Sequence, residues 1–449
     1  MANALIVLGA GKGSRMESDL PKVLHPIGGA PMLVHAMKAG ATLDPERQIV
    51  VAGHQAGLVE AAAKDWDPDV QVVRQEQQLG TAHAVAQARP ALNGFDGDAI
   101  VLYGDTPFIR PETLEAILAA RATHDVVVLG FEAADPGRYG RLVAQGDVLE
   151  RIVEFKDADE ATRAVTLCNS GVVAADAATL FDLIEAVGND NASGEYYLTD
   201  IVEIARARGL TAGVVRCDEA ETLGVNSRAE LVRAEALFQT HARAAALEDG
   251  AILTAPDTVM MAHDTALGRD CMVEAYVVFA PGVTVESGAT IRAFSHLEDC
   301  HVSRGAVVGP YARLRPGTEL AENAKVGNFV EIKKAVIGEG AKVNHLSYVG
   351  DATIGAQANI GAGSVTCNYD GFFKHHTTIG DGAFIGSSTM LVAPVTVGAG
   401  AMTGSGSVIT TDVPEGALAL GRAKQVNKPG LARRIMDKLR AAKAAKRKG

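Results

Sequence analysis

A glycine-rich segment near the start of the chain could bind phosphate. Residues 8–16 read Leu-Gly-Ala-Gly-Lys-Gly-Ser-Arg-Met after a short apolar stretch, so their backbone N–H groups could cradle phosphate oxygens. Arg15, and Lys22 on a proline-stiffened segment beyond the loop, would face the same phosphate. The loop is not a Walker A motif, because glycine follows Lys12, and Ser14 breaks the dinucleotide fingerprint. Alone it is a weak sign of phosphate binding.

A carboxylate follows another apolar stretch. Residues 99–103 resemble a strand and lead into Gly104, Asp105 and a proline at position 107. Parallel sheets bind ligands at the carboxyl ends of their strands. An aspartate there suits Mg²⁺, which takes one or two carboxylates and keeps several waters. The alternative is that Asp105 only begins a turn.

These residues need a sheet to bring them together. Residues 1–226 alternate strand-like stretches, at 4–8, 48–52, 99–103 and 125–129, with helix-like segments, which predicts an α/β domain with a mostly parallel sheet. The capping box that begins at Ser227 predicts a helix to about Leu247, about 30 Å long. We interpret residues 227–249 as a rigid helical linker and residues 250–449 as a second domain.

The second domain repeats an aliphatic residue about every six positions, which predicts a parallel β-helix in which each unit forms one flat side of a prism. We expect one residue to be lost before Ile337 and one before Ile354, and a loop over residues 367–378. The predicted stack is Val285, Ile291, Leu297, Val308, Leu314, Leu320, Val326, Ile332, Ile337, Val343, Val349, Ile354, Ile360, Ile379, Ile385, Leu391, Val397, Thr403 and Ile409. Glycines that follow stack positions are expected at corners with positive φ, namely Gly309, Gly327, Gly338, Gly350, Gly355, Gly361, Gly380, Gly386 and Gly398.

Composition excludes several classes of protein. With 449 residues, two or three domains are expected. No stretch resembles a signal peptide or a membrane span, and the net charge of −12 argues against general nucleic-acid binding, so we expect a soluble cytoplasmic protein. The five scattered cysteines suggest neither disulfides nor a zinc site. The basic segment 433–448 could bind an anionic partner, or be a solvated tail.

The loop at residues 8–16, together with Pro-Lys-Val-Leu at 21–24, resembles the sugar-phosphate nucleotidyltransferases. With the β-helix behind it, the chain is similar over nearly its whole length to the bacterial family of bifunctional N-acetylglucosamine-1-phosphate uridylyltransferase and glucosamine-1-phosphate N-acetyltransferase. Further similar stretches are 75–83, 139–141, 152–154, 169–171, 195–200 and 224–226. Gly9 stands where the family usually has alanine, and Ser14 and Ser170 replace threonine, so no charged group is lost.

The resemblance implies two steps of UDP-N-acetylglucosamine synthesis, a route to peptidoglycan, other cell-wall material and lipopolysaccharide precursors. Glucosamine-1-phosphate would be acetylated from acetyl-CoA in the C-terminal domain. N-acetylglucosamine-1-phosphate would then attack UTP in the N-terminal domain with Mg²⁺, releasing pyrophosphate. The resemblance also implies a left-handed coil and a homotrimer. The alternatives are another sugar nucleotidyltransferase with a non-catalytic, trimerising β-helix, and an inactive scaffold.

The resemblance assigns roles residue by residue. For the nucleotide and its phosphates it implies Leu8, Gly9, Ala10, Gly11, Arg15 and Lys22; for uracil Gln75, Gly80 and Thr81; for the sugar Tyr103, Gly104, Gly140, Glu154 and Asn169; and for Mg²⁺ Asp105 and Asn226. In the acetyltransferase it implies His345 as the general base, Arg315, Lys333, Tyr348 and Asn359 for the sugar phosphate, and Ala362, Asn368, Tyr369, Ser387, Ser405 and Arg422 for acetyl-CoA. A lone histidine in a repeat is more often structural, but an imidazole suits deprotonation of a sugar ammonium near neutral pH.

Overall fold

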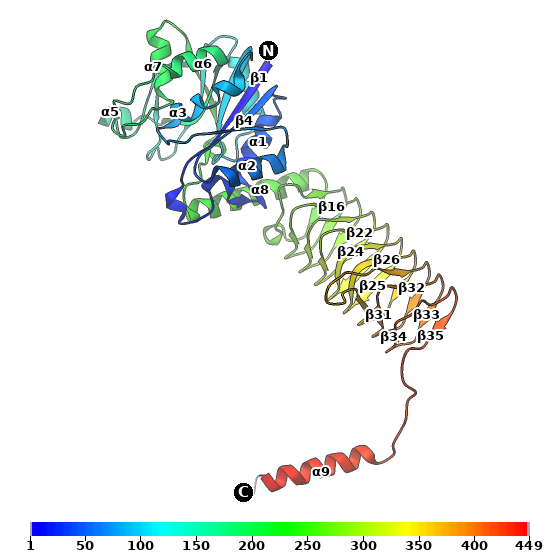
Figure 1. Cartoon of the computed structure of the whole chain (residues 1–449). Helices are drawn as coiled ribbons and strands as arrows, with labels where there is room; N and C mark the ends of the chain where they lie inside the picture. Colours follow the sequence, from blue (N-terminus) through cyan, green and yellow to red (C-terminus); the bar gives the residue numbers. More distant parts are fainter. Residues whose placement is uncertain (1, 447–449) are drawn as a thin grey trace. The chain divides into compact units, whose positions relative to one another are not determined.

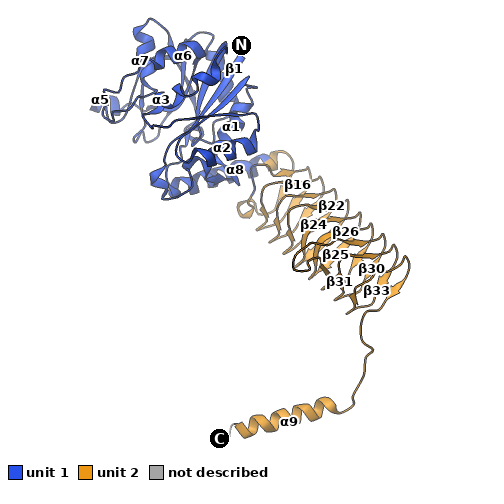
Figure 2. Ribbon diagram, in the orientation of Figure 1, with its two compact units in different colours: residues 1–245, 261–263 blue, residues 246–260, 264–449 orange. Residues whose placement is uncertain are grey.

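The computed structural model describes residues 2–446, which form two compact units (Figures 1 and 2). Unit 1 contains residues 1–245 and 261–263, and unit 2 contains residues 246–260 and 264–449. The α/β domain and the β-helix predicted from the sequence are confirmed. No helix among residues 2–446 is both long and apolar enough to cross a bilayer.

Unit 1 is built on a nine-stranded, mostly parallel sheet in the order β5-β4-β1-β6-β10-β7-β11-β9-β8. β1 pairs in parallel with β4 and β6, and β10 runs antiparallel between β6 and β7. Its strands are β1 (Ala2–Gly9), β2 (Pro26–Ile27), β3 (Ala30–Pro31), β4 (Arg47–Ala52), β5 (Gln71–Arg74), β6 (Gly97–Tyr103), β7 (Val126–Glu132), β8 (Arg141–Gln145), β9 (Val148–Val153), β10 (Leu167–Asp176) and β11 (Ala212–Cys217), of which β2 and β3 form a separate hairpin.

Helices cover both faces of this sheet (Figure 1). Buried residues of α3, α6 and α7 pack on one face, and those of α1, α2 and α4 pack on the other. The helices of unit 1 are η1 (Ser14–Met16), η2 (Lys22–Leu24), α1 (Met32–Ala41), α2 (Ala56–Trp66), α3 (Thr81–Ala86), η3 (Arg89–Leu92), α4 (Pro111–Ala120), α5 (Glu160–Arg163), α6 (Ala177–Ile184), α7 (Asp200–Ala207), η4 (Glu219–Thr222) and most of α8 (Arg228–Glu248). Because both faces are covered, ligands can reach the sheet only at its edges.

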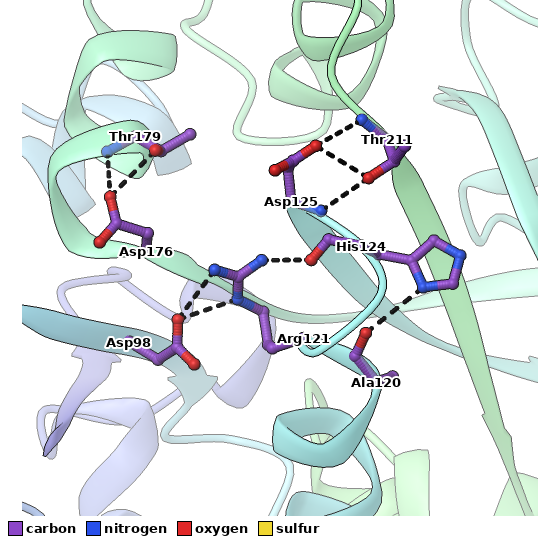
Figure 3. Close-up of polar contacts among 8 residues, drawn as sticks. All are labelled: Asp98, Ala120, Arg121, His124, Asp125, Asp176, Thr179 and Thr211. Carbon is purple, nitrogen blue, oxygen red and sulfur yellow. Dashed lines mark hydrogen bonds and ion pairs between the residues drawn. The ribbon is translucent and has the colours of Figure 1, made fainter. Parts of the chain in front are cut away.

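Polar side chains secure the amino-terminal edge of the sheet (Figure 3). Asp98, at the start of β6, is buried and accepts from Nε and Nη2 of Arg121, each at 2.9 Å. Asp125, before β7, accepts from the backbone and hydroxyl of Thr211, before β11. This edge is therefore a paired structural network, and the opposite edge carries the candidate site.

Helix α8 packs against unit 1. Ala234 is fully buried with Ile27, Met32 and Val225, and Phe238 contacts the same cluster. The compact unit thus extends to residue 245, whereas the sequence interpretation placed the helix between the domains from residue 227. The repeated small and apolar residues on one face of α8 are the physical reason, since they need a surface to cover them.

Unit 2 is a left-handed parallel β-helix with three flat faces. The first face is a ten-stranded sheet, and a fourteen-stranded sheet bends around the other two because β24 and β26 each run through both. The first face contains β12 (Ile252–Leu253), β14 (Met272–Val273), β17 (Thr290–Ile291), β20 (Val307–Val308), β23 (Lys325–Asn328), β25 (Lys342–His345), β27 (Asn359–Ile360), β30 (Phe384–Ile385), β33 (Met402–Thr403) and β35 (Leu418–Ala419). η5 (Pro256–Thr258) lies in the first coil.

The second and third faces share two strands. The second contains β15 (Val278–Phe279), β18 (His296–Leu297), β21 (Arg313–Leu314), the start of β24 (Glu331–Ile337) and of β26 (Tyr348–Ile354), β28 (Val365–Cys367), β31 (Met390–Val392) and β34 (Val408–Ile409). The third contains β13 (Ala266–Leu267), β16 (Val283–Val285), β19 (Cys300–Val302), β22 (Thr318–Leu320), the ends of β24 and β26, β29 (Thr377–Ile379) and β32 (Val395–Val397). All their pairings are parallel.

The predicted stack is confirmed, since every residue predicted for it is buried. The prediction of only two short steps is wrong, because buried Val302 follows Leu297 after five residues and makes a third. The predicted loop is shorter than expected. Cys367 still belongs to β28 and Thr377 and Thr378 to β29, so the chain leaves the prism only over residues 368–376.

The expectation for the glycines is wrong in its physical reason. Of the nine, only Gly309 has a positive φ. At the others a Cβ would meet a neighbouring coil or side chain, for example 2.5 Å from the backbone nitrogen of Ser387 at Gly361 and of Glu415 at Gly398. These glycines therefore permit close approach of successive coils.

One corner of the prism carries an aromatic ladder. Tyr276, Phe294, Tyr311 and Phe329 all have positive φ, and their rings stack with centroids 4.9–5.3 Å apart. Each ring is about half exposed. The basic C-terminal segment forms α9 (Leu431–Lys446), which buries no residue; Arg447 and Lys448 of that segment lie outside the described residues.

Candidate active sites

The glycine-rich loop and β6 form one side of a cavity in unit 1. Gly104 N–H donates to Leu8 O at 2.9 Å, which joins the ends of β1 and β6, and Gln78 Nε2 donates to Ala10 O at 2.8 Å. The cavity measures about 310 Å³. It is lined by Leu8, Ala10, Gly11, Lys22, Val23, Gln75, Gln78, Gly80, Thr81, Ala84, Tyr103, Asp105 and Glu195. Nine of these were sequence candidates; Gln78 and Glu195 were in the similar stretches but had no role.

The Gln75–Thr81 segment is held in a fixed shape. Gln75 is buried, and its Nε2 donates to Gly80 O at 3.1 Å. Gly80 has φ of 120°, and a Cβ there would meet Tyr196 O at 2.4 Å, so only glycine fits. Thr81 Oγ1 accepts from Leu198 N–H at 2.9 Å. These contacts present backbone and amide groups to the cavity, which could read the edge of a planar base.

Asp105, Asn226 and two cations meet at the carboxyl edge of the sheet. Lys22 Nζ forms an ion pair with Asp105 and donates to Asn226 Oδ1 at 3.0 Å, and Arg15 donates to the same oxygen at 3.1 Å. Asp105 O accepts from Val225 N–H at 3.0 Å, which fixes the segment before Asn226. Two side-chain oxygens therefore face one point that the Lys22 ammonium already approaches.

This arrangement fits a hard divalent cation. One carboxylate and one amide oxygen are the ligand types that Mg²⁺ prefers, and so few protein ligands leave room for phosphate oxygens and water. In the described part of the chain, no group of three or more His, Cys, Asp or Glu residues could hold a metal ion.

The three remaining sugar candidates lie together. A Cβ on Gly140 would sit 3.5 Å from Glu154 Oε1 and 3.6 Å from Asn169 Cβ, and Asn169 N–H donates to Gly140 O at 2.9 Å. Burial raises the pKa of Glu154, an effect that a hydrogen bond from Thr199 opposes. Tyr103 connects this group to the cavity, because its ring packs against Gly171, two residues after Asn169.

A larger hollow of about 640 Å³ borders this cavity and shares Gln75 and Gln78 with it. Its other lining residues include Lys12, His54 and Arg74, all exposed. Apart from Gln75 it contains no sequence candidate. The chemistry favours the smaller cavity, where the paired oxygens and cations converge.

In unit 2, His345 ends β25 at the corner between the first and second faces. Its Nδ1 lies 2.9 Å from Asn328 Oδ1, one coil earlier. An amide oxygen only accepts, so this contact selects the neutral tautomer that has its proton on Nδ1 and its lone pair on Nε2. Asn328 had no role in the sequence interpretation. Its position 17 residues before His345, one coil of this β-helix, is the signal that could have found it.

Three acetyl-CoA candidates continue from His345 along the axis. Gly363 N–H donates to His345 O, Ser388 N–H to Ala362 O, and Gly406 N–H to Ser387 O. Ile360 is in register with Ile385, and Phe384 is in register with Met402. These pairings and hydrogen bonds together align one residue of each coil. We call this set the His345 column, and it contains His345, Ala362, Ser387 and Ser405. Arg422 follows Gly421, whose carbonyl accepts from Val408 N–H at 3.0 Å, so it lies beside the second face and outside the column.

Arg315 and Lys333 occupy neighbouring coils of the second face. The register of Leu314 with Ile332 puts these two cations side by side, and Lys333 is in turn paired with Gly350. A Cβ at Gly350 would meet Tyr348 Oη at 2.4 Å, so the Tyr348 hydroxyl lies over this position. Two adjacent cations and a hydroxyl can bind a phosphate dianion.

Other acetyltransferase candidates are placed differently. Asn368 Nδ2 contacts Tyr348 and Asp351, and Tyr369 lies on the 368–376 loop with Lys374 over its ring at 4.1 Å. Asn359 begins β27 and pairs with Lys342, so it lies at the far end of the first face from His345. Within one chain, Asn359 does not join the other candidates.

Comparisons with known proteins follow the same division. The model of the MobA-like NTP transferase domain matches residues 5–189, and that of the bacterial transferase hexapeptide (six repeats) matches residues 376–411. Three curated relatives bear the name Bifunctional protein GlmU. They are from Ruegeria pomeroyi (69% identical, all of both chains), Jannaschia sp. (66%, 99% of this chain and 98% of the relative) and Roseobacter denitrificans (65%, all of both chains).

Proposed function

The chain belongs to the GlmU family of bifunctional proteins, and from this premise we propose which residues perform its two reactions. It is a bifunctional enzyme that transfers acetyl to glucosamine-1-phosphate and uridylyl to N-acetylglucosamine-1-phosphate. The product serves cell-wall peptidoglycan synthesis. A single-activity enzyme with a non-catalytic β-helix is not favoured.

For uridylyl transfer, we propose that the loop from Leu8 to Gly11 and Lys22 hold the nucleotide, and that Gln75, Gly80 and Thr81 read uracil. The 310 Å³ cavity that these residues share supports this assignment. Tyr103, Gly104, Gly140, Glu154 and Asn169 then hold the sugar, beside the same cavity. The sugar phosphate attacks the α-phosphorus and pyrophosphate leaves, so no protein nucleophile is needed and positioning with charge neutralisation carries the rate.

Asp105 and Asn226 are proposed to hold Mg²⁺. When bound, the ion neutralises phosphate charge and orients the reacting oxygens. The convergence of both side-chain oxygens on Lys22 is the observation that supports this. Lys22 then turns from these ligands to a phosphate, with Arg15 alongside.

For acetyl transfer, we propose that Arg315, Lys333 and Tyr348 bind the phosphate of glucosamine-1-phosphate and that His345 Nε2 takes a proton from its ammonium group. The freed amine attacks the thioester carbonyl, and the thiol of coenzyme A leaves. Asn328 supports this role because it holds the proton on Nδ1. The His345 column supports acetyl-CoA as the donor, since it offers a straight track from the base to Ser405, and the charge of Arg422 beyond it suits a cofactor phosphate. Asn368 and Tyr369 would flank this track.

We propose a homotrimer in which β-helices pack side by side. Two observations support it: Asn359 lies away from the other candidates of its own chain, and the half-exposed aromatic ladder is a surface that water does not favour. We propose that residues 1–226 carry the uridylyltransferase site and residues 250–449 the acetyltransferase site, with residues 227–249 as the connecting helix, most of which belongs to compact unit 1.

One incubation tests both activities. The protein is mixed with glucosamine-1-phosphate, acetyl-CoA, UTP and Mg²⁺, and thiol and pyrophosphate are measured separately. Release of both is expected. Pyrophosphate from supplied N-acetylglucosamine-1-phosphate without any thiol release would leave only the single-activity alternative, and neither product would indicate a scaffold.

A further inference from the structure

Arg141 is an arginine buried at the start of β8, with a residue exposure of 2%. Its guanidinium donates to four backbone carbonyls: Pro136 O at 3.2 Å, Gly137 O at 3.1 Å, Arg163 O at 3.3 Å, and Tyr139 O. Burying a charge is costly unless it is fully hydrogen-bonded. The planar fork of five donors satisfies these acceptors at fixed angles, which an ammonium group cannot do.

The acceptors belong mainly to one short segment. Residues 136–139 lead directly into Gly140, one of the proposed sugar residues. Because three of their carbonyls are tied to one rigid group, the backbone of the segment is fixed just before it reaches the sugar site.

The same guanidinium reaches the neighbours of the other two sugar residues. It lies 5.9 Å from the ring centroid of Phe155, which follows Glu154. Arg141 is also paired in register with Cys168 of β10, which precedes Asn169. Gly140 therefore directly precedes Arg141, and Glu154 and Asn169 are each next in sequence to a residue that Arg141 contacts.

Phe155 has two further cations on it. The guanidinium carbon of Arg163 lies 4.7 Å and that of Arg138 lies 5.8 Å from its ring centroid. Arg138 is exposed and does not share the carbonyl hydrogen bonds of Arg141, which makes it a matched control in the same loop.

We propose that Arg141 is the positioning residue of the sugar site, holding three separate segments so that Gly140, Glu154 and Asn169 face one sugar. This rests on the proposed roles of those three residues. Arg141 touches no substrate, and the nucleotide cavity is built without it. Its loss should therefore be felt in sugar binding and not in UTP binding.

The test is Arg141→Lys in the full chain, with Arg138→Lys as control. For Arg141→Lys, kcat/KM for N-acetylglucosamine-1-phosphate should fall on the order of 10²-fold, the usual effect of a displacement of about 1 Å. The KM for UTP and the rate of thiol release should not change, and Arg138→Lys should behave as the wild type. Equal losses toward both substrates, or no loss, would overturn the proposal.

Two further measurements cover misfolding. Arg141→Ala should regain sugar turnover when millimolar guanidinium is added, whereas methylammonium should not restore it. If neither Arg141 variant binds UTP, Phe155→Leu is the deciding variant, because it keeps the hydrogen bonds between Arg141 and the backbone carbonyls. It should raise the KM for the sugar phosphate alone, and an unchanged KM would refute the proposal. A wild-type chain that makes no pyrophosphate would instead refute the proposed function.

Discussion

The ammonium nitrogen of Lys22 lies 3.0 Å from the amide oxygen of Asn226, although 204 residues separate them. The start of α8 secures this contact, because Glu230 Oε2 accepts from Asn226 N–H at 2.6 Å, and Arg228 Nε donates to Met16 O at 3.1 Å at the end of the phosphate loop. The helix that ends unit 1 thus completes a site begun by its first strand.

The first prediction concerns the metal ligands. Asp105→Ala should abolish pyrophosphate release and leave thiol release unchanged, because it removes the only carboxylate of the proposed Mg²⁺ site and leaves unit 2 intact. Both products are measured in one reaction. Asp19→Ala, an exposed acid in the same region, is the control, and parallel loss of both activities in folded Asp105→Ala would contradict the two-site assignment.

His345→Ala should have the converse effect. Loss of a general base typically lowers a rate about 10²–10⁴-fold, so thiol release should collapse while uridylylation of supplied N-acetylglucosamine-1-phosphate stays normal. Asn328→Ala should give a smaller loss, since the imidazole would lose its orientation only. His301→Ala, a histidine paired with Glu286 on the third face, is the control. An unchanged acetylation rate for His345→Ala would show a structural histidine.

Glu154 predicts a pH dependence of stability. Burial raises its folded-state pKa, so it holds its proton more tightly in the folded chain; the stabilisation is present below its unfolded pKa and is lost as pH rises through the raised value. Glu154→Gln does not titrate. The melting temperature of unit 1 in this variant, relative to the wild type, should therefore rise from about pH 4 to about pH 8. A difference that is constant with pH would contradict this.

A comparison of fragments tests the boundary between the units. Residues 1–249 should keep uridylyl transfer, since every residue assigned to it lies at or before Asn226. They should be less stable than residues 1–263, because buried Gln239 exchanges two hydrogen bonds with Met261, and the loss of both costs about 1–3 kcal/mol. Equal denaturation midpoints would refute this.

The complementary fragment tests the trimer. Residues 250–449 should keep acetyl transfer and sediment as a trimer, whereas the N-terminal fragment should be smaller than a trimer. A monomeric C-terminal fragment that acetylates at the full rate would contradict an active site shared between β-helices.

Two glycines in one coil test whether glycine is needed there for the close approach of successive coils. Gly398→Ala should destabilise unit 2 by about 1–3 kcal/mol, because its Cβ would meet the next coil. At Gly400 a Cβ has open space, but φ is 60°, so alanine is strained and asparagine is tolerated. Thermal denaturation should show that asparagine destabilises unit 2 less than alanine does at position 400, but not at position 398. The same ranking at both positions would contradict the distinction between a strained φ and a close approach of coils.

The sequence was sufficient to predict the architecture, because two of its patterns follow directly from which residues pack in the core. Alternating apolar stretches located β1, β4, β6 and β7, and the six-residue period located the buried stack. Asp105 could be proposed from its place after a strand. Asn226 could not be placed by spacing, because only the folded chain brings α8 to the carboxyl edge; it came from resemblance alone.

Other misses have definite physical causes. A glycine can serve either a positive φ or a close approach, and the sequence does not distinguish them, so the corner interpretation was wrong at eight positions of nine. Val302 was missed because a five-residue step looks like a gap in a six-residue pattern. Arg141 lay in the similar stretch 139–141 but received no role, because the carbonyls that hold it have no sequence signature.

In the three-faced coil, the number of residues between two positions determines the angle between them around the axis of the β-helix. Each face corresponds to about a third of a turn, and a full coil, commonly of 17 or 18 residues, advances the chain by one strand spacing of about 4.8 Å. Removing one complete coil ahead of His345 would therefore shift the acetyltransferase residues along the axis without rotating them. Removing a single six-residue unit would rotate every later residue by a third of a turn and move the His345 column to another face. Length variation in this domain is thus tolerated in whole coils, and the number of coils can change while the direction in which the site faces stays the same.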